Sequence, residues 1–177
     1  MRLIEQFKEY ILVLYLVLPP LLRDGLIFFF ILALVLCFVL KGLKNGWKLL
    51  SKIVLVEYIF LIYCSTVFFR KNNDLGGYSF IPFWSYEEIA YGRHELLVEN
   101  TMNVLAFLPI GLLLGLSFKC IRSMSVLLIC LCLSLSIEIM QFMFGRGFSE
   151  MDDLIHNTCG GLIGFWSYCA FKWIKSK

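Results

Sequence analysis

The sequence has little charge. Charged residues make up 16% of its 177 residues, whereas an ordinary soluble domain has about 25%. Hydrophobic residues reach 60% and occur in long blocks, as the hydrocarbon core of a bilayer requires. The formal net charge of +3 is too small to suggest a nucleic acid partner. These features exclude an ordinary soluble domain and predict one compact unit that lies in a membrane.

The sequence also lacks the usual signs of a zinc site or a cleaved leader. There are only two histidines, and no pair of its seven cysteines has the spacing of metal ligands. All but Cys120 fall inside apolar runs, where small apolar packing residues are expected. The first apolar run ends in Leu-Pro-Pro-Leu at 18–21, without a small-residue cleavage site.

The apolar blocks predict an all-α, polytopic transmembrane helical bundle of six segments. The segments cover residues 9–22, 26–43, 49–69, 101–118, 124–144 and 154–174. The last four are long enough to span a bilayer. The first is short and contains Pro19 and Pro20, so it could be a short span, an interfacial helix or part of a re-entrant hairpin. We expect an added helical hairpin over 1–48 and a four-helix core over 49–177.

The basic residues predict the orientation. Lys and Arg in short loops mark the cytoplasmic side, and they gather at three places that alternation puts on one side: Lys41, Lys44, Lys48 and Lys52; Lys119 and Arg122; and Lys172, Lys175 and Lys177. The connections at 70–100 and 145–153 are each net acidic, by 3 − 5 = −2 and 1 − 3 = −2. We therefore expect a multi-pass protein of the cytoplasmic membrane with both termini in the cytoplasm.

The longest connection, about 30 residues at 70–100, is rich in aromatic residues between Tyr78 and Tyr86. Aromatic residues of this density are typical of the membrane–water boundary. Two interpretations stay open. The segment is a half-buried strip on the outer leaflet, or it is a lid or lipid-contacting wall over a site.

Polar residues inside the last three segments are the candidates for chemistry, because each polar group in a bilayer requires a partner or a purpose. Glu138 and Gln141 lie three residues apart and share a helix face. Asp153 and Asn157 lie four apart near the start of the last segment, where Asp152 and Asp153 are also favoured by the helix dipole. Asp153 could equally be a capping residue. Three glycines at 160, 161 and 164 predict close helix packing.

The depths of these residues agree. When depth is counted by helix rise from the outer ends of the segments, five polar side chains fall in the outer third of the membrane. Two arginines lie at the same level. We call these seven the outer polar layer: Arg70, Asn103, Glu138, Gln141, Arg146, Asp153 and Asn157. The layer predicts an outward-facing site, although a purely structural polar network would also produce it. Glu57 lies near the middle of the membrane and has no assigned role.

The order and spacing of these residues resemble the VanZ-like family of small bacterial membrane proteins, which is named for a teicoplanin-resistance protein. The matching residues are Asn103, Phe107, Pro109 and Gly111, then Glu138 and Gln141, then Arg146, then Asp153, Asn157, Gly160 and Gly164, together with Arg70 and Ile-Pro-Phe at 81–83. The resemblance covers roughly residues 55–170. Ser79 stands where the family often has Asn, and Glu150 where Asp is frequent. The resemblance implies a role at the cell envelope and reduced susceptibility to lipoglycopeptides, but no reaction.

Three functions compete. The first is an enzyme acting on a lipid-linked envelope substrate, with Glu138 and Asp153 as acid and base or as ligands of Mg²⁺ or Ca²⁺. The predicted substrate-binding residues are Arg70, Asn103, Gln141, Arg146, Asp152 and Asn157. The second is a binding module without turnover for a lipoglycopeptide or a lipid-linked cell-wall precursor. The third, a transporter or flippase, ranks last because no continuous polar path crosses the membrane. Membrane lipids are expected partners in all three, and whether the protein is an enzyme stays open.

Overall fold

A computed structural model describes residues 46–70 and 77–177, together with Gly25, Ile31 and Val35. The predicted segments 9–22 and 26–43 lie outside the described residues, apart from these single positions. The count of six segments is therefore not tested by the structure. The described part is mainly helical, as expected from its apolar blocks.

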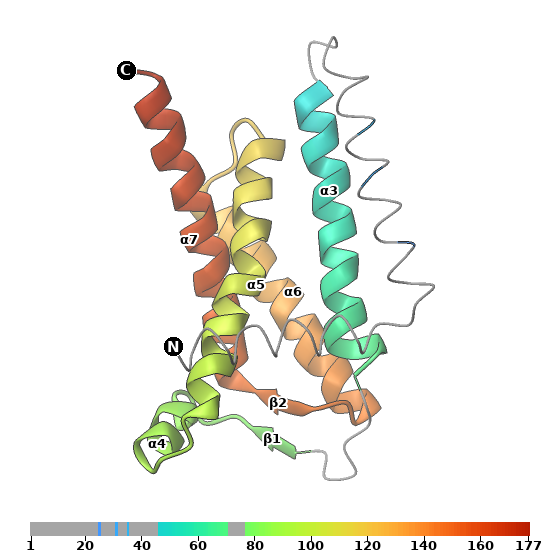
Figure 1. Ribbon diagram of the computed structural model, residues 1–177, viewed down its shortest axis with the longest axis vertical. Coiled ribbons are helices and arrows are strands. Elements are labelled where there is room, and N and C mark those ends of the chain that lie inside the picture. The colour runs from blue at the N-terminus through green and yellow to red at the C-terminus, as the bar shows by residue number, and fades with distance from the viewer. Residues whose placement is uncertain (1–24, 26–30, 32–34, 36–45, 71–76) are drawn as a thin grey trace.

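The described elements follow one another along the chain in a simple order. They are α3 (Gly46–Tyr63), the π-helix η1 (Cys64–Phe68), β1 (Gly77–Ser79), α4 (Trp84–Ala90), α5 (Glu95–Ser117), α6 (Ser123–Phe144), β2 (Phe148–Glu150) and α7 (Met151–Lys175). Figure 1 shows the four long helices side by side, with α4 and both strands gathered at the end opposite the C-terminus. We call that end the strand end.

Three of the described helices are long and apolar enough to cross a membrane. They cover Gly46–Phe68, Glu95–Ser117 and Ser123–Phe144, in agreement with three of the predicted spans. Helix α7 has 25 residues and covers the predicted segment 154–174. It is not among the three, because its polar first turns and its glycines lower its hydropathy. That α7 spans the membrane remains a prediction.

A short parallel sheet departs from the expected all-α fold. Strand β1 pairs with β2 in the register Gly77 to Phe148, Tyr78 to Ser149 and Ser79 to Glu150. Segments of three residues are too short to show strand periodicity in the sequence. Helix α4 likewise lies inside the predicted connection 70–100. That connection is therefore partly ordered secondary structure that packs on the bundle.

Glycines let α5 and α7 pack backbone to backbone. A methyl group added at Gly160 would overlap the backbone oxygen of Val104, and one at Gly164 would overlap that of Leu108. Gly111 in α5 lies equally close to the backbone oxygen of Gly161. The predicted smooth glycine face is confirmed. It fixes the distance between the two helices that carry Asn103 and Asp153.

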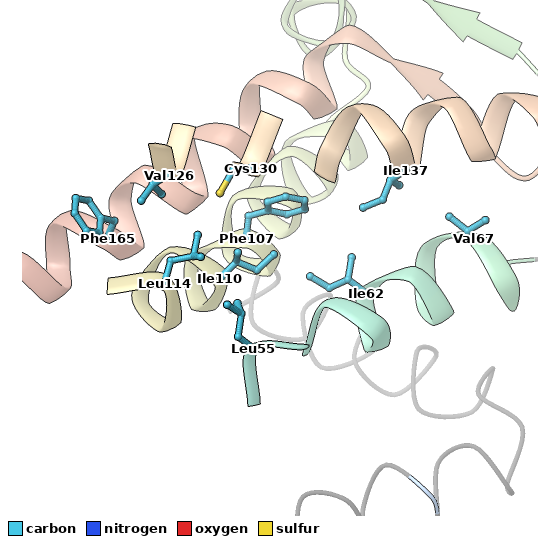
Figure 2. Packing of buried hydrophobic residues seen from close by; sticks show 10 residues of the cluster. All are labelled: Leu55, Ile62, Val67, Phe107, Ile110, Leu114, Val126, Cys130, Ile137 and Phe165. Carbon is cyan, nitrogen blue, oxygen red and sulfur yellow. The ribbon is translucent and has the colours of Figure 1, made fainter. Parts of the chain in front are cut away.

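The apolar core lies between all four long helices. Figure 2 shows the buried side chains that form it, with Phe107 and Ile110 of α5 among Leu55, Ile62, Ile137 and Phe165. Cys130 is fully buried and packs against Gly161, as expected for a small apolar residue. The core therefore holds the polar ends of α5, α6 and α7 in fixed relative positions.

Candidate functional site

Glu138 links α6 to the small sheet. Its side chain is 5% exposed, and its Oε2 atom accepts a hydrogen bond from the backbone N–H of Glu150 at 2.9 Å. The hydroxyl of Ser149 lies 3.4 Å from the backbone oxygen of Glu138 and donates to it. Gln141 is also buried on this helix, which confirms that it shares a face with Glu138, and the buried Ser134 lies on the same face one turn earlier. The predicted carboxylate of α6 thus lies at the strand end of the bundle.

Asp153 joins α7 to α5. Its Oδ1 atom accepts a hydrogen bond of 2.6 Å from the side-chain amide of Asn103. One turn along α7, the amide of Asn157 donates to the hydroxyl of Ser134 in α6 at 2.9 Å. These two bonds bring the polar residues of three helices together. The predicted convergence of Asn103, Asp153 and Asn157 is therefore present.

The carboxylates of this end interact electrostatically. The charge of Glu138 acts on Asp153, the charge of Asp153 acts on Glu150, and the charge of Glu99 acts on both Asp153 and Glu150. Burial of Glu150, with the negative charges of Asp153 and Glu99 as further causes, raises the pKa of Glu150 to about 8. Glu150 therefore keeps its proton at neutral pH.

Arg70 is the cation that faces this acidic group. It is exposed, and its charge acts favourably on both Glu138 and Asp153. Its guanidinium packs against Gly147, where an added methyl carbon would lie 2.7 Å from the guanidinium carbon. Gly147 has φ +100°, a conformation that favours glycine. The loop after α6 is thus shaped to admit the arginine.

Arg146 and Gln141 have a different set of contacts. Arg146 donates to the backbone oxygens of Val67, at 2.9 Å, and Phe68, and Gln141 donates to that of Thr66 at 3.1 Å. These carbonyls belong to η1, at the end of the span formed by α3 and η1. Both side chains keep a buried polar atom without a hydrogen bond, Oε1 of Gln141 and Nε of Arg146. Both residues lie in the outer polar layer, and their hydrogen bonds to the backbone stabilise the π-helical turn η1. A substrate-binding role for them stays a prediction.

Asp152 is completely buried and binds the start of α4. Its Oδ1 atom accepts from the backbone N–H of Phe83 at 2.5 Å, and its Oδ2 atom from the N–H of Ser85 at 3.0 Å and from the Ser85 hydroxyl at 2.5 Å. Asn100 of α5 donates to the same hydroxyl at 3.0 Å. These contacts attach α4 to α5 and α7. The substrate-binding role expected for Asp152 stays a prediction.

The aromatic connection packs on β2 and α7 at the strand end of the bundle. The indole N–H of Trp84 donates to Oε2 of Glu150 at 3.2 Å, and the Tyr86 hydroxyl lies 2.8 Å from Nε2 of His156. The large side chains of Tyr78, Phe80 and Phe83 are each more than half exposed. The buried contacts favour a wall over the site, and the exposed rings fit a strip at the membrane boundary. The two interpretations therefore apply to different side chains of one segment.

Metal binding by Glu138 and Asp153 remains a prediction. In residues 46–70 and 77–177, no group of three or more His, Cys, Asp or Glu side chains is placed to hold an ion. An ion on these two carboxylates would need amide or water oxygens to complete its ligand shell, as Mg²⁺ and Ca²⁺ accept.

Sequence reasoning missed Glu150, Glu99 and Ser85 as parts of this end. Glu150 was noted only as a loop charge and a departure from the family pattern. Its position directly before the first turn of α7, which carries two more acids, was the available signal. Ser85 gives no such signal, because only the fold brings it to Asp152.

Comparisons with known proteins identify a family and a relative of this chain. The family model described as VanZ/LLP1 matches residues 26–172, which include the predicted segment 26–43. "Protein VanZ" of Enterococcus faecium is 32% identical to this chain, and the match covers 68% of this chain and 74% of that protein. No solved structure matches.

Proposed function

The chain belongs to the VanZ/LLP1 family, and on that premise we propose that its outer polar layer binds the headgroup of a lipid-linked envelope substrate or of a lipoglycopeptide. Three helices of spanning length and apolar composition, together with the family, support a membrane protein. The proposal places the layer at the extracytoplasmic surface, where such ligands are found, and associates the protein with reduced susceptibility to teicoplanin.

One observation carries the proposal: carboxylates and amides from α5, α6 and α7 meet at one end of the bundle. Asn103 binds Asp153, Asn157 binds Ser134, and Glu138 binds the backbone of Glu150. Each polar group placed in a hydrocarbon environment costs free energy. Their convergence beneath an ordered aromatic segment therefore supports a prepared site.

The charges of the layer favour a ligand that donates hydrogen bonds. Glu138, Asp153, Glu150 and Glu99 act on one another, and Arg70 opposes them. Arg146 is engaged with backbone oxygens, which leaves Arg70 as the better candidate for a phosphate or carboxylate group of the ligand. Ammonium or hydroxyl groups of a sugar or peptide headgroup would complement the acids.

Glu150 supports a modifying enzyme as the second candidate. Its pKa of about 8 keeps it protonated at neutral pH. Neighbouring carboxyl groups in differently solvated environments can supply the acid and the base that group transfer requires. In that reaction Glu138 or Asp153 would be the base and Glu150 the acid. Without turnover, the same residues describe a binding module.

The test is the teicoplanin susceptibility of bacteria that express the full chain. Glu138→Gln and Asp153→Asn keep the size of each side chain and remove its charge, and we expect both to abolish the protection given by the wild type. Glu87→Gln is the matched control, because Glu87 is an exposed acid on α4. Equal protection by both layer variants, at equal expression, would refute the proposed site. A wild type without protection would remove the association with the drug.

Mass spectrometry separates binding from modification. Purified protein is incubated with teicoplanin or with a lipid-linked precursor, and both bound ligand and product are measured. The enzyme candidate predicts a product that Glu138→Gln or Glu150→Gln eliminates while ligand binding is retained. The binding module predicts capture of unchanged ligand, and recovery of a product would exclude it.

A further inference from the structure

The end opposite the strand end carries two hollows that the proposed function does not use. They flank the turn between α5 and α6, at residues 118–121. One has a volume of about 290 Å³ and lies between that turn and α7. The other, of about 540 Å³, lies between the turn, α3 and α6. Phe118, Lys119 and Ile121 line both.

The lining of both hollows is cationic. Lys48, Lys52 and Lys119 line the larger hollow, and Lys119 and Lys172 line the smaller one. All four lysines are exposed. Among the described residues that line the hollows, none is an Asp or a Glu. The positive charge of these described lining residues suits an anion.

Aromatic and apolar side chains accompany the lysines. The amino group of Lys52 lies 5.2 Å from the ring centroid of Phe118, in a cation–π contact. Tyr168 and Trp173 line the smaller hollow, and Ile129 lines the larger one. A charged group beside exposed apolar side chains suits a ligand that has both a headgroup and an acyl chain.

The hollows lie where a bilayer would place its headgroups. Helix α3 begins at Gly46, α5 ends at Ser117 and α7 ends at Lys175, and Figure 1 shows these three helix ends at the end of the molecule opposite the strand end. Helix α6 begins at Ser123, one connection below the end of α5. Lysines and aromatic rings at the ends of spanning helices face the membrane–water boundary. Basic hollows at this level are typical of lipid headgroup sites.

We propose that these hollows bind the phosphate of an anionic phospholipid, with Lys119 between them and with Lys52 and Lys172 on either side. The acyl chains would cover the exposed apolar side chains of α6 and α7. Free phosphate presents the same anion, but it would leave the apolar lining exposed to water. The proposal does not depend on the function proposed for the strand end.

Native mass spectrometry of the detergent-purified full chain tests this site, with phosphatidylglycerol and phosphatidylcholine as the probes. The variant K52Q/K119Q removes two charges from the hollows. The variant K175Q/K177Q removes two charges from the same end, at residues that line neither hollow. Each lysine near an anionic lipid surface changes binding by about fivefold, so K52Q/K119Q should bind phosphatidylglycerol roughly 30-fold more weakly.

The outcomes are distinct. Preference for phosphatidylglycerol that K52Q/K119Q loses and K175Q/K177Q retains supports the proposal. An equal loss in both variants would indicate diffuse surface charge and overturn it, as would an unchanged affinity in K52Q/K119Q. Displacement of the lipid by equimolar inorganic phosphate would show a site for the free anion and would also overturn it. Equal helical circular dichroism of all variants confirms that they are folded.

Discussion

Replacement of Asp152 should release α4 from the bundle. The carboxylate is completely buried and accepts hydrogen bonds from two backbone N–H groups and one hydroxyl. Asp152→Ala leaves these donors buried without an acceptor. Each buried donor left without an acceptor costs about 1–3 kcal/mol, so the loss over the three donors is at least about 3 kcal/mol. For a chain of this size each kcal/mol lowers Tm by about 2–4 °C, so we expect Tm to fall by about 10 °C.

Asp152→Asn gives a sharper comparison, because it keeps the volume and one acceptor oxygen. In either orientation its amide group must face one of the two backbone N–H groups, so we expect Tm to fall by about half as much as in the alanine variant. Circular dichroism melts at one scan rate measure Tm, and hydrogen exchange of the peptide 77–94 measures the release of α4. Glu87→Gln is the control on the surface of α4. The reasoning fails if Asp152→Asn melts within 1 °C of the wild type and peptide 77–94 exchanges at the wild-type rate.

Three further predictions follow from the packing, the charges and the sequence. Gly164→Ala places a methyl group on the backbone of Leu108 and should cost at least about 2 kcal/mol in a thermal melt; Cys159→Ala, at an exposed position of α7, should change Tm little. The pKa of Glu150 is raised in the folded protein, so the contribution of this carboxyl to stability is present below about pH 4.5 and lost as the pH rises through 8. The difference in Tm between pH 5 and pH 9 should therefore be smaller in Glu150→Gln than in the wild type. Single cysteines at Tyr91, which is 86% exposed in the connection 70–100, and at Ser176, in a variant without other cysteines, should react with an impermeant thiol reagent from opposite sides of the membrane. Labelling from one side would refute the predicted orientation.

The positions of the helices and the convergence of the polar layer could be predicted from sequence. Apolar blocks of about 20 residues identify spanning helices directly, and the spacing of Glu138 and Gln141 fixes their common face. The glycines of α7 indicate close packing because only small residues permit it. These signals are local and periodic, so they need no knowledge of the tertiary fold.

The contacts of the site residues could not be predicted in the same way. The sequence does not show that Asp152 binds the start of α4, or that Arg146 binds the carbonyls of η1, because these partners lie more than 60 residues away along the chain. The pairing of β1 with β2 depends on two three-residue segments, which carry no periodic pattern. Long-range hydrogen bonds of this kind follow from the fold and have no local sequence pattern.

The dimensions of α7 connect the two ends of the molecule. Asp153 and Lys172 lie nineteen positions apart on one helix, which at 1.5 Å per residue separates them by about 28 Å. The hydrocarbon core of a bilayer is about 30 Å thick. When the ammonium group of Lys172 lies among headgroups on one side, Asp153 therefore reaches the boundary on the other. The backbone contact between α5 and α7 fixes Asn103 at the same depth. A lipid phosphate held by the lysines would thus keep the outer polar layer at the opposite surface, where a headgroup can enter it.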